Sequence, residues 1–330
     1  MTDAERIDAV AKLGFTPRQA GFLVTVAMHA GVCLSRQYAT YSGLVWGHVV
    51  REFFTALVKR RIATPFPCAR GGANLYRLQH KTIYRAIGEP DSRLRRPVSL
   101  PRAVERLMIL DAVLDDPDAV WLGSERDKLT HFRACTSLPE EDMPRLIFRS
   151  SAGAATVRYF PDRLPIGCHP DGRAPVFLYL VRAWDPFEFR LFLQRHGALL
   201  RALAEWRIRL LVPPHLEGAE KRHEVACWNE FATPLKPEEV EELRWYFERR
   251  RALGEASPDS GEERFRRAHI MFSKPRYRAL YKQWSELGEG LLELQGSHLL
   301  GEALERQSGR VDCHVLARQY SHLAPLVGSV

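Results

Sequence analysis

Acidic residues are scarce in the first quarter of this 330-residue chain. Residues 1 to 97 hold fifteen Lys or Arg and six Asp or Glu, a net charge of +9. Because the whole chain carries +8, the residues after position 97 sum to −1. Between residues 12 and 85 one acid, Glu52, stands against eleven basic residues. Positive charge at this density favours nucleic-acid phosphate as a partner, through Coulomb attraction and release of counterions.

The chain also lacks long apolar runs. No segment approaches the roughly eighteen consecutive apolar residues that a membrane-spanning helix needs. The N-terminal sequence MTDAERIDAV has neither the basic nor the apolar region of a secretory signal. We therefore expect a cytoplasmic protein that does not bind membranes.

The six cysteines are widely scattered and form no CxxC motif. With 45% apolar residues the chain can build a core without disulfides, so we expect reduced, buried thiols. Cys168-His169 and Cys313-His314 lack a second ligand pair at zinc spacing, so we predict no metal site. The sequence has no glycine-rich phosphate loop and no recognisable nucleophile–His–acid pattern. We predict no cofactor and no enzymatic activity.

Residues 34 to 85 predict a short helix, a turn, a longer amphipathic helix and a β-hairpin. Thr16-Pro17, a capping hydroxyl before proline, indicates the start of an earlier helix. This order is typical of a winged helix, in which the longer helix enters a DNA groove. The apolar face of that helix is expected to contain Val49, Val50, Phe53, Phe54, Leu57 and Val58, and its outer face His48, Arg51, Thr55 and Lys59.

Basic residues flank the longer helix on both sides. Arg36 and Gln37 begin the short helix, where backbone amides and a cation can approach phosphate. Gly71 and Gly72 favour a hairpin tip, which we expect to form a basic wing. The predicted DNA-binding residues are Arg36, Gln37, His48, Arg51, Thr55, Lys59, Arg60, Arg61, Arg70 and Arg77.

Two other interpretations fit the same pattern. A basic outer face is often simply a solvated face, and helix-turn-helix shapes also bind proteins or RNA. Trp46, at the start of the longer helix, is expected to pack rather than to contact a base.

The rest of the chain divides by composition. We predict a winged-helix domain over residues 1–90, a linker over 91–100, an α/β domain over 101–232 and a helical region over 233–330. The apolar run of residues 176–181, a helix from Pro186 to Leu203 and the strand at 207–212 predict a parallel crossover. Long helices are expected over 264–287 and 288–307. Their mixture of arginines and aromatics favours an amphipathic helix, with a second DNA contact or a dimer interface as alternatives.

Phe160-Pro161-Asp162 raises an enzymatic alternative. Nucleases of the PD-(D/E)xK type place an Asp on one strand and an acid-x-Lys on the next, to hold Mg²⁺ and position water. Here Arg182 follows the apolar strand without an acid two residues before it. A site would need a loop carboxylate such as Asp171 or Asp185. The alternative interpretation makes Asp162 a turn residue that bonds nearby amides.

The helix-turn-helix and wing from Thr16 to Arg85, with the block from Phe160 to Pro214, resemble the replication-relaxation-type proteins of plasmids and mobile elements. The resemblance covers about half of the chain. It implies a winged helix followed by a domain related to restriction endonucleases, often without an intact active site. The family's acidic position after the apolar strand is absent here.

We therefore expect an α+β multidomain protein that binds double-stranded DNA through a winged helix. It would act as a transcriptional regulator or as a replication or maintenance factor of a mobile element. The α/β domain and the C-terminal region would serve assembly, as a homodimer or with a protein partner. A Mg²⁺-dependent nuclease centred on Asp162 and a winged-helix protein adaptor are the alternatives.

Overall fold

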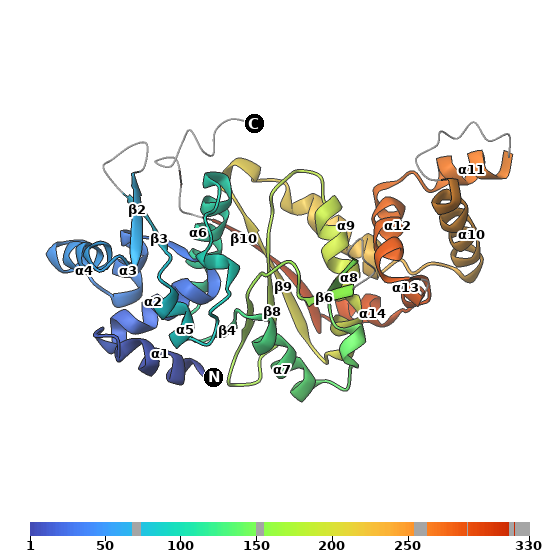
Figure 1. The fold of residues 1–330 in the computed structure, drawn as a ribbon. Coiled ribbons are helices and arrows are strands. Elements are labelled where there is room, and N and C mark those ends of the chain that lie inside the picture. Colours follow the sequence, from blue (N-terminus) through green and yellow to red (C-terminus); the bar gives the residue numbers. More distant parts are fainter. Residues whose placement is uncertain (68–73, 150–154, 254–262, 289, 317–319, 321–330) are drawn as a thin grey trace. The chain divides into compact units, whose positions relative to one another are not determined.

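The computed structural model describes residues 1–67, 74–149, 155–253, 263–288, 290–316 and 320 (Figure 1). The chain is a mixed α+β protein with several sheets and divides into two compact units. Unit 1 comprises Met1–Gly123, Gly167–Asp171 and Val315–Val330, and unit 2 comprises Ser124–Ile166 and Gly172–His314. The first boundary therefore lies near residue 123 rather than at the predicted residue 90.

Unit 1 begins with the predicted succession of helices and a hairpin. Thr16 caps α2 through the backbone amide of Gln19, as its position before Pro17 predicts. Strands β1, β3 and β2 form an antiparallel sheet in that order. The elements are α1 (Asp3–Ala11), α2 (Pro17–His29), β1 (Val32–Leu34), α3 (Ser35–Ser42), α4 (His48–Lys59), β2 (Ala63–Pro67) and β3 (Asn74–Leu78).

Aromatic side chains form the core beneath α4. Phe53 packs against Phe22 and Tyr38, with ring centroids 6.4 and 4.3 Å apart. Val50, Phe53, Phe54 and Leu57 are buried as their helical spacing predicts. Val49 is 57% exposed, so its assignment to the apolar face was wrong, although its neighbour Val50 in the same turn is fully buried.

The segment predicted to be a linker packs against unit 1. Gly31 follows α2 with φ +69°, and a β-carbon there would overlap the backbone oxygen of Leu94. Because the chain turns so closely over α2, residues 91–100 belong to unit 1 and do not separate two domains. This part contains α5 (Lys81–Ala86), the 3-10 turn η1 (Arg93–Arg95), α6 (Leu100–Leu114) and β4 (Val120–Leu122), which neighbours β7 (Ile166–Cys168).

Unit 2 contains the predicted parallel crossover. Strand β8 (Val176–Leu180) pairs in parallel with β9 (Trp206–Val212), and α8 (Phe187–Ala202) connects them. All five residues of β8 are buried, as expected for a strand covered on both faces. Strand β10 (Gly309–Val315) lies beside β9. The antiparallel pair β5 (Arg145–Arg149) and β6 (Ala155–Tyr159), with α7 (Glu125–Cys135), η2 (Glu140–Asp142), η3 (Pro214–Leu216) and α9 (Glu220–Phe231), completes this part.

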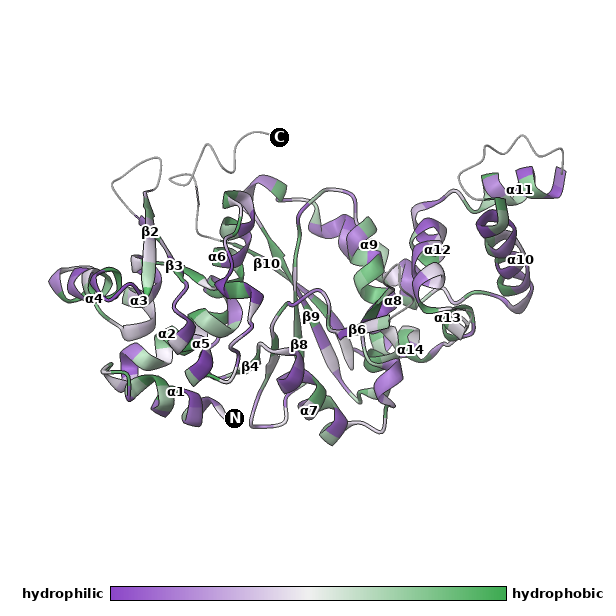
Figure 2. Cartoon of the chain, in the orientation of Figure 1, coloured by the Kyte–Doolittle hydropathy of each residue, from purple (hydrophilic) through white to green (hydrophobic). Residues whose placement is uncertain are grey.

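The helical region is not a separate unit, because α10 to α14 belong to unit 2. The predicted helix over 264–287 is two helices, since Pro275 cannot donate the hydrogen bond that would continue the first one. In Figure 2, α10 is coloured mostly hydrophilic, and its buried residues Leu243, Tyr246 and Phe247 pack into a local core. The helices are α10 (Pro237–Leu253), α11 (Glu263–Met271), α12 (Pro275–Leu287), α13 (Gly290–Leu294) and α14 (Leu299–Glu305).

Two further expectations concern the cysteines and membrane-spanning helices. Cys33 and Cys227 are buried, but Cys135 and Cys313 are exposed, so not all thiols lie in the core as expected. Within the described part of the chain, no helix combines the length and the apolar composition needed to cross a membrane.

Candidate nucleic-acid interface

The outer face of α4 carries the predicted stripe of polar side chains. His48, Arg51, Thr55 and Lys59 are all exposed and lie three or four residues apart, on one side of the helix. His48 Nδ1 lies 3.4 Å from Glu52 Oε2, and both side chains are largely exposed. Because exposed pairs of this kind are weak, Glu52 leaves most of the positive charge on this face available.

Trp46 supports Arg51 from the turn before α4. The Arg51 guanidinium lies 5.5 Å from the centroid of the Trp46 ring, a cation–π distance. Trp46 Nε1 donates a 3.4 Å hydrogen bond to Ser35 Oγ at the start of α3. The indole is nevertheless 58% exposed, so it is a surface residue and not the buried packing residue that was expected.

The basic run after α4 remains at the surface, but its members differ. Arg60 stacks over Phe15 at 4.4 Å and donates to the backbone oxygen of Leu13, so its position is fixed by the connection between α1 and α2. Arg61 is exposed and has φ +55°, in the left-handed region. Lys59, Arg60 and Arg61 thus extend the charge of α4 beyond its C-terminus.

Arg36 and Gln37 do not belong to an interface, and their assignment to DNA is corrected. Arg36 donates to both carboxylate oxygens of Asp111 on α6, at 2.8 and 2.7 Å. Gln37 is fully buried and donates to Asp111 at 2.9 Å and to the Leu107 carbonyl at 3.1 Å. Tyr320 Oη also donates to Asp111. These residues therefore anchor α3 to α6 and hold the scaffold on which α4 rests.

Asp111 is a carboxylate with a structural role. Burial alone raises its pKa, but hydrogen bonds and charge from Arg36 outweigh that effect, so the pKa lies below its usual value. The carboxylate therefore stays ionised and paired at neutral pH.

The predicted wing residues have different positions. Arg77 is half-buried in β3, where it pairs with Thr64, three residues from Pro67–Asn74, the last pair before the connection between the two strands. Its guanidinium donates to Gln79 at 2.6 Å and lies over Phe66 at 5.4 Å. Arg77 is therefore held by the sheet rather than placed at the tip. Arg70, with Gly71 and Gly72, lies outside the described residues.

Two surface features were missed by sequence reasoning. Arg18, in the first turn of α2, is exposed; burial raises the pKa of Tyr41, and the charge of Arg18 offsets part of that rise. Val45 is 92% exposed beside Trp46. The position of Arg18 directly after Thr16-Pro17, in the first turn of a helix, could have indicated that it is exposed. Val45 gave no signal, because a valine before a helix is normally expected to pack.

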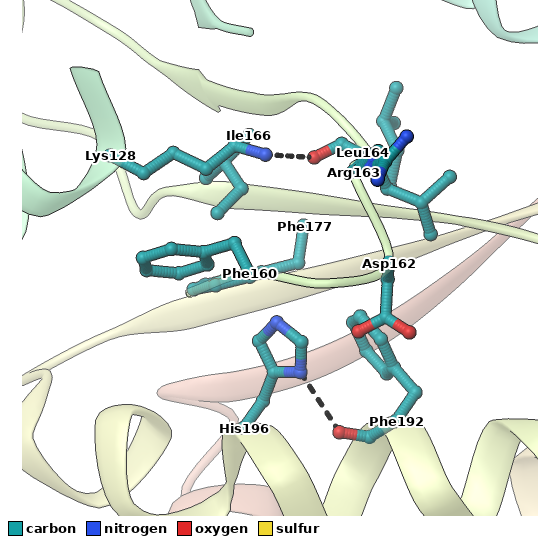
Figure 3. A pocket seen from close by; sticks show the side chains of 10 residues that line it. Lys128, Phe160, Asp162, Arg163, Leu164, Ile166, Phe177, Phe192 and His196 are labelled. Carbon is teal, nitrogen blue, oxygen red and sulfur yellow. Dashed lines mark hydrogen bonds between the residues drawn. The ribbon is translucent and has the colours of Figure 1, made fainter. Parts of the chain in front are cut away.

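Asp162 of the nuclease hypothesis lies in a buried charged cluster of unit 2 (Figure 3). Its Oδ1 accepts a 2.8 Å bond from Arg195, while Oδ2 is buried without a hydrogen-bond partner. The Lys128 ammonium donates to the Leu164 carbonyl at 2.8 Å, and His196 Nδ1 lies 2.9 Å from the Phe192 carbonyl. A cavity of about 10 Å³ separates these groups, which is room for about one water molecule.

Burial determines the protonation of this cluster. It lowers the pKa of Lys128 to about 8 and that of His196 to about 4. His196 is therefore neutral at pH 7, and the Asp162–Arg195 pair is the ionic contact that fixes the turn after β6. The cavity is too small for a phosphodiester to enter, so we interpret the cluster as part of the core.

The other proposed nuclease residues are not among those that line this cavity. Arg182 is exposed, just after the end of β8. Asp171 is exposed and belongs to unit 1, whereas Asp162 and Arg182 belong to unit 2. Among the residues described, no group of three or more His, Cys, Asp or Glu side chains is arranged to hold a metal ion.

Comparison of the chain with protein-family models, with curated proteins and with solved structures finds no match in any of the three.

Proposed function

We propose that this protein binds double-stranded DNA through unit 1, with α4 as a recognition helix in a winged-helix arrangement. The single observation that carries the proposal is the exposed stripe of His48, Arg51, Thr55 and Lys59 on α4. A groove-binding helix needs such a stripe on the face opposite its core contacts.

The arrangement of unit 1 supports the winged-helix interpretation. Helices α2, α3 and α4 precede the antiparallel hairpin β2–β3, and β1 adds the third strand beside β3 (Figure 1). The inner face of α4 is fixed by the aromatic core, while α3 is fixed by Asp111. A rigid support of this kind keeps the outer face of α4 in one orientation, which precise contact with a groove requires.

The charges suit different parts of a duplex. Arg51 and Thr55, near the middle of the stripe, would reach base edges in the major groove. Lys59, Arg60 and Arg61 at the end of α4, and Arg18 at the start of α2, would contact flanking phosphates. Trp46 would hold the Arg51 guanidinium beside the groove through the cation–π contact.

Unit 2 would then serve assembly or contact with a protein partner. The parallel β8–α8–β9 crossover supports the expected likeness to a restriction-endonuclease-like domain in this one motif. The pairing of Asp162 with Arg195 favours a structural role for the carboxylate. Such a protein would regulate transcription or maintain a mobile element.

Fluorescence anisotropy with a labelled duplex of about 30 base pairs, titrated at several salt concentrations, tests the proposal. The Arg51→Ala/Lys59→Ala variant removes two charges from the α4 stripe. We expect its affinity to fall about tenfold or more, and the slope of log K against log salt to fall by roughly 1, because Lys59 is the phosphate contact of this pair and each lost phosphate contact lowers the slope by about 1. Both residues are exposed, so the fold should be unaffected.

The matched control is Arg266→Ala/Arg267→Ala, which removes two exposed charges from α11 in unit 2. Equal losses in both double variants would contradict an interface on α4, because they would indicate attraction to net charge alone. A protein adaptor predicts no salt-sensitive binding. A nuclease predicts plasmid nicking with Mg²⁺ that Asp162→Ala abolishes.

A further inference from the structure

Four arginines line a second, separate pocket within unit 2. The pocket has a volume of about 290 Å³, and its lining includes Arg173, Arg207, Arg306 and Arg310. Glu205 is the one carboxylate among its nine lining residues. The excess of positive charge around one hollow indicates an anionic ligand.

The pocket lies where three strands begin. Arg173 and Ala174 precede β8, Glu205 and Trp206 stand at the start of β9, and Ser308 precedes β10. The Trp206 amide donates to the Ser308 carbonyl at 2.9 Å, which joins the starts of β9 and β10. A β-carbon on Gly309 would overlap the buried Trp206 ring, so the glycine backbone packs closely on the indole beside the pocket. Arg207 on β9 and Arg310 on β10 therefore lie at this end of the sheet, while Arg173 precedes β8 and Arg306 follows α14.

Three of these arginines, Arg207, Arg306 and Arg310, retain hydrogen-bond donors for a ligand. Arg207 pairs with Asp312 at 3.0 Å, and Arg306 pairs with Glu302 at 3.2 Å. Arg310 uses its Nε to donate to the Gln307 carbonyl at 2.8 Å. A guanidinium has five N–H donors, so one carboxylate or carbonyl leaves most of them unused. The two ion pairs are partly exposed and give way at low cost when a more highly charged anion enters.

We propose that this pocket binds a small phosphate-bearing molecule. Guanidinium groups match phosphate oxygens in bidentate pairs, and several of them around one hollow favour an ion with several negative charges over a single carboxylate. The volume lies at the lower end for small-molecule sites, which suits a phosphate or diphosphate group with a small substituent. Binding here is independent of the proposed contact between α4 and DNA.

Isothermal titration calorimetry of the full chain with inorganic pyrophosphate tests the site, at low ionic strength in a phosphate-free buffer. We expect saturable one-to-one binding with a Kd below about 1 mM, which is within the range that the method measures. Arg306→Gln and Arg310→Gln should each weaken it about tenfold, because each removes a charged donor. Both side chains are exposed, so these variants keep the core intact. Acetate should bind far more weakly.

Arg266→Gln is the matched control, an exposed arginine on α11 whose loss should leave pyrophosphate binding unchanged. Absence of saturable binding, or an equal loss in the control, would overturn the proposal. Competition by single-stranded DNA with a 5′-phosphate, compared with the same strand carrying a 5′-hydroxyl, identifies the source of the phosphate. If the 5′-phosphorylated strand alone displaces pyrophosphate, the phosphate comes from a nucleic-acid end. If neither strand does, it belongs to a free small molecule.

Discussion

Gly31 and Gly43 form a matched pair that tests whether the segment around Leu94 packs on unit 1. Both glycines have left-handed backbones, with φ +69° and +65°. A β-carbon on Gly31 would overlap the Leu94 oxygen and lie within 2.9 Å of its carbonyl carbon, whereas one on Gly43 would meet no atom within 4 Å. The Gly43→Ala substitution therefore bears the cost of the left-handed conformation alone, about 1 kcal/mol.

Gly31→Ala bears the same conformational cost and also overpacks a backbone contact, which adds about 1–3 kcal/mol. We expect the free energy of unfolding of unit 1 to fall by about 2–4 kcal/mol in Gly31→Ala and by about 1 kcal/mol in Gly43→Ala. Urea unfolding, monitored by hydrogen exchange in peptides of unit 1, measures the free energy of unfolding of both variants. Costs that agree within about 0.5 kcal/mol would refute the packing of Leu94 on Gly31, because that difference is the size of an ordinary surface effect.

Two further predictions concern buried charges. Asp111→Ala leaves Arg36 and Gln37 without their acceptor and should lower the free energy of unfolding, measured by urea titration, by about 3 kcal/mol. Asp118→Ala, at an exposed position, is the control and should lower it by less than about 0.5 kcal/mol. Burial opposes ionisation of Asp111, but Arg36 outweighs it and the pKa of Asp111 is lowered. The contribution of Asp111 to the free energy of unfolding should therefore be lost as pH falls through that lowered pKa. Equal acid sensitivity of the wild type and the Asp111→Ala variant would contradict this. Burial lowers the pKa of Lys128 from 10.5 to about 8, so the unfolded chain binds more protons between these values and stability should rise with pH across this window. Lys128→Met should flatten that rise in denaturation curves measured from pH 8 upward, and an unchanged slope would count against the buried lysine.

Local patterns predicted most of the elements. Helical spacing of apolar residues located α4, and the apolar run at 176–181 with the following helix located the parallel β8–β9 pair. These predictions succeeded because periodicity and burial act over a few neighbouring residues. The break at Pro275 had a local signal too, but it was given too little weight against the continuous amphipathic pattern.

Contacts between distant residues could not be predicted in this way. Arg36 and Asp111 are 75 residues apart, and no local pattern indicates that a basic residue at the start of α3 will meet an acid on α6. The same holds for the segment at Leu94, whose prolines and charges suggested a linker. In the candidate interface, spacing along α4 identified exposed residues well. It failed for Arg36 and Gln37, whose partners come from another helix.

Site-specific photo-cross-linking tests most directly whether the outer face of α4 contacts DNA. A benzophenone amino acid replaces Thr55, in the middle of the stripe, or Glu248, an exposed residue of α10. Irradiation with labelled duplex DNA should give a covalent protein–DNA product from position 55 that fades as salt increases, and little from position 248. A product from position 248 alone, or from neither position when anisotropy shows binding, would contradict α4 as the recognition helix.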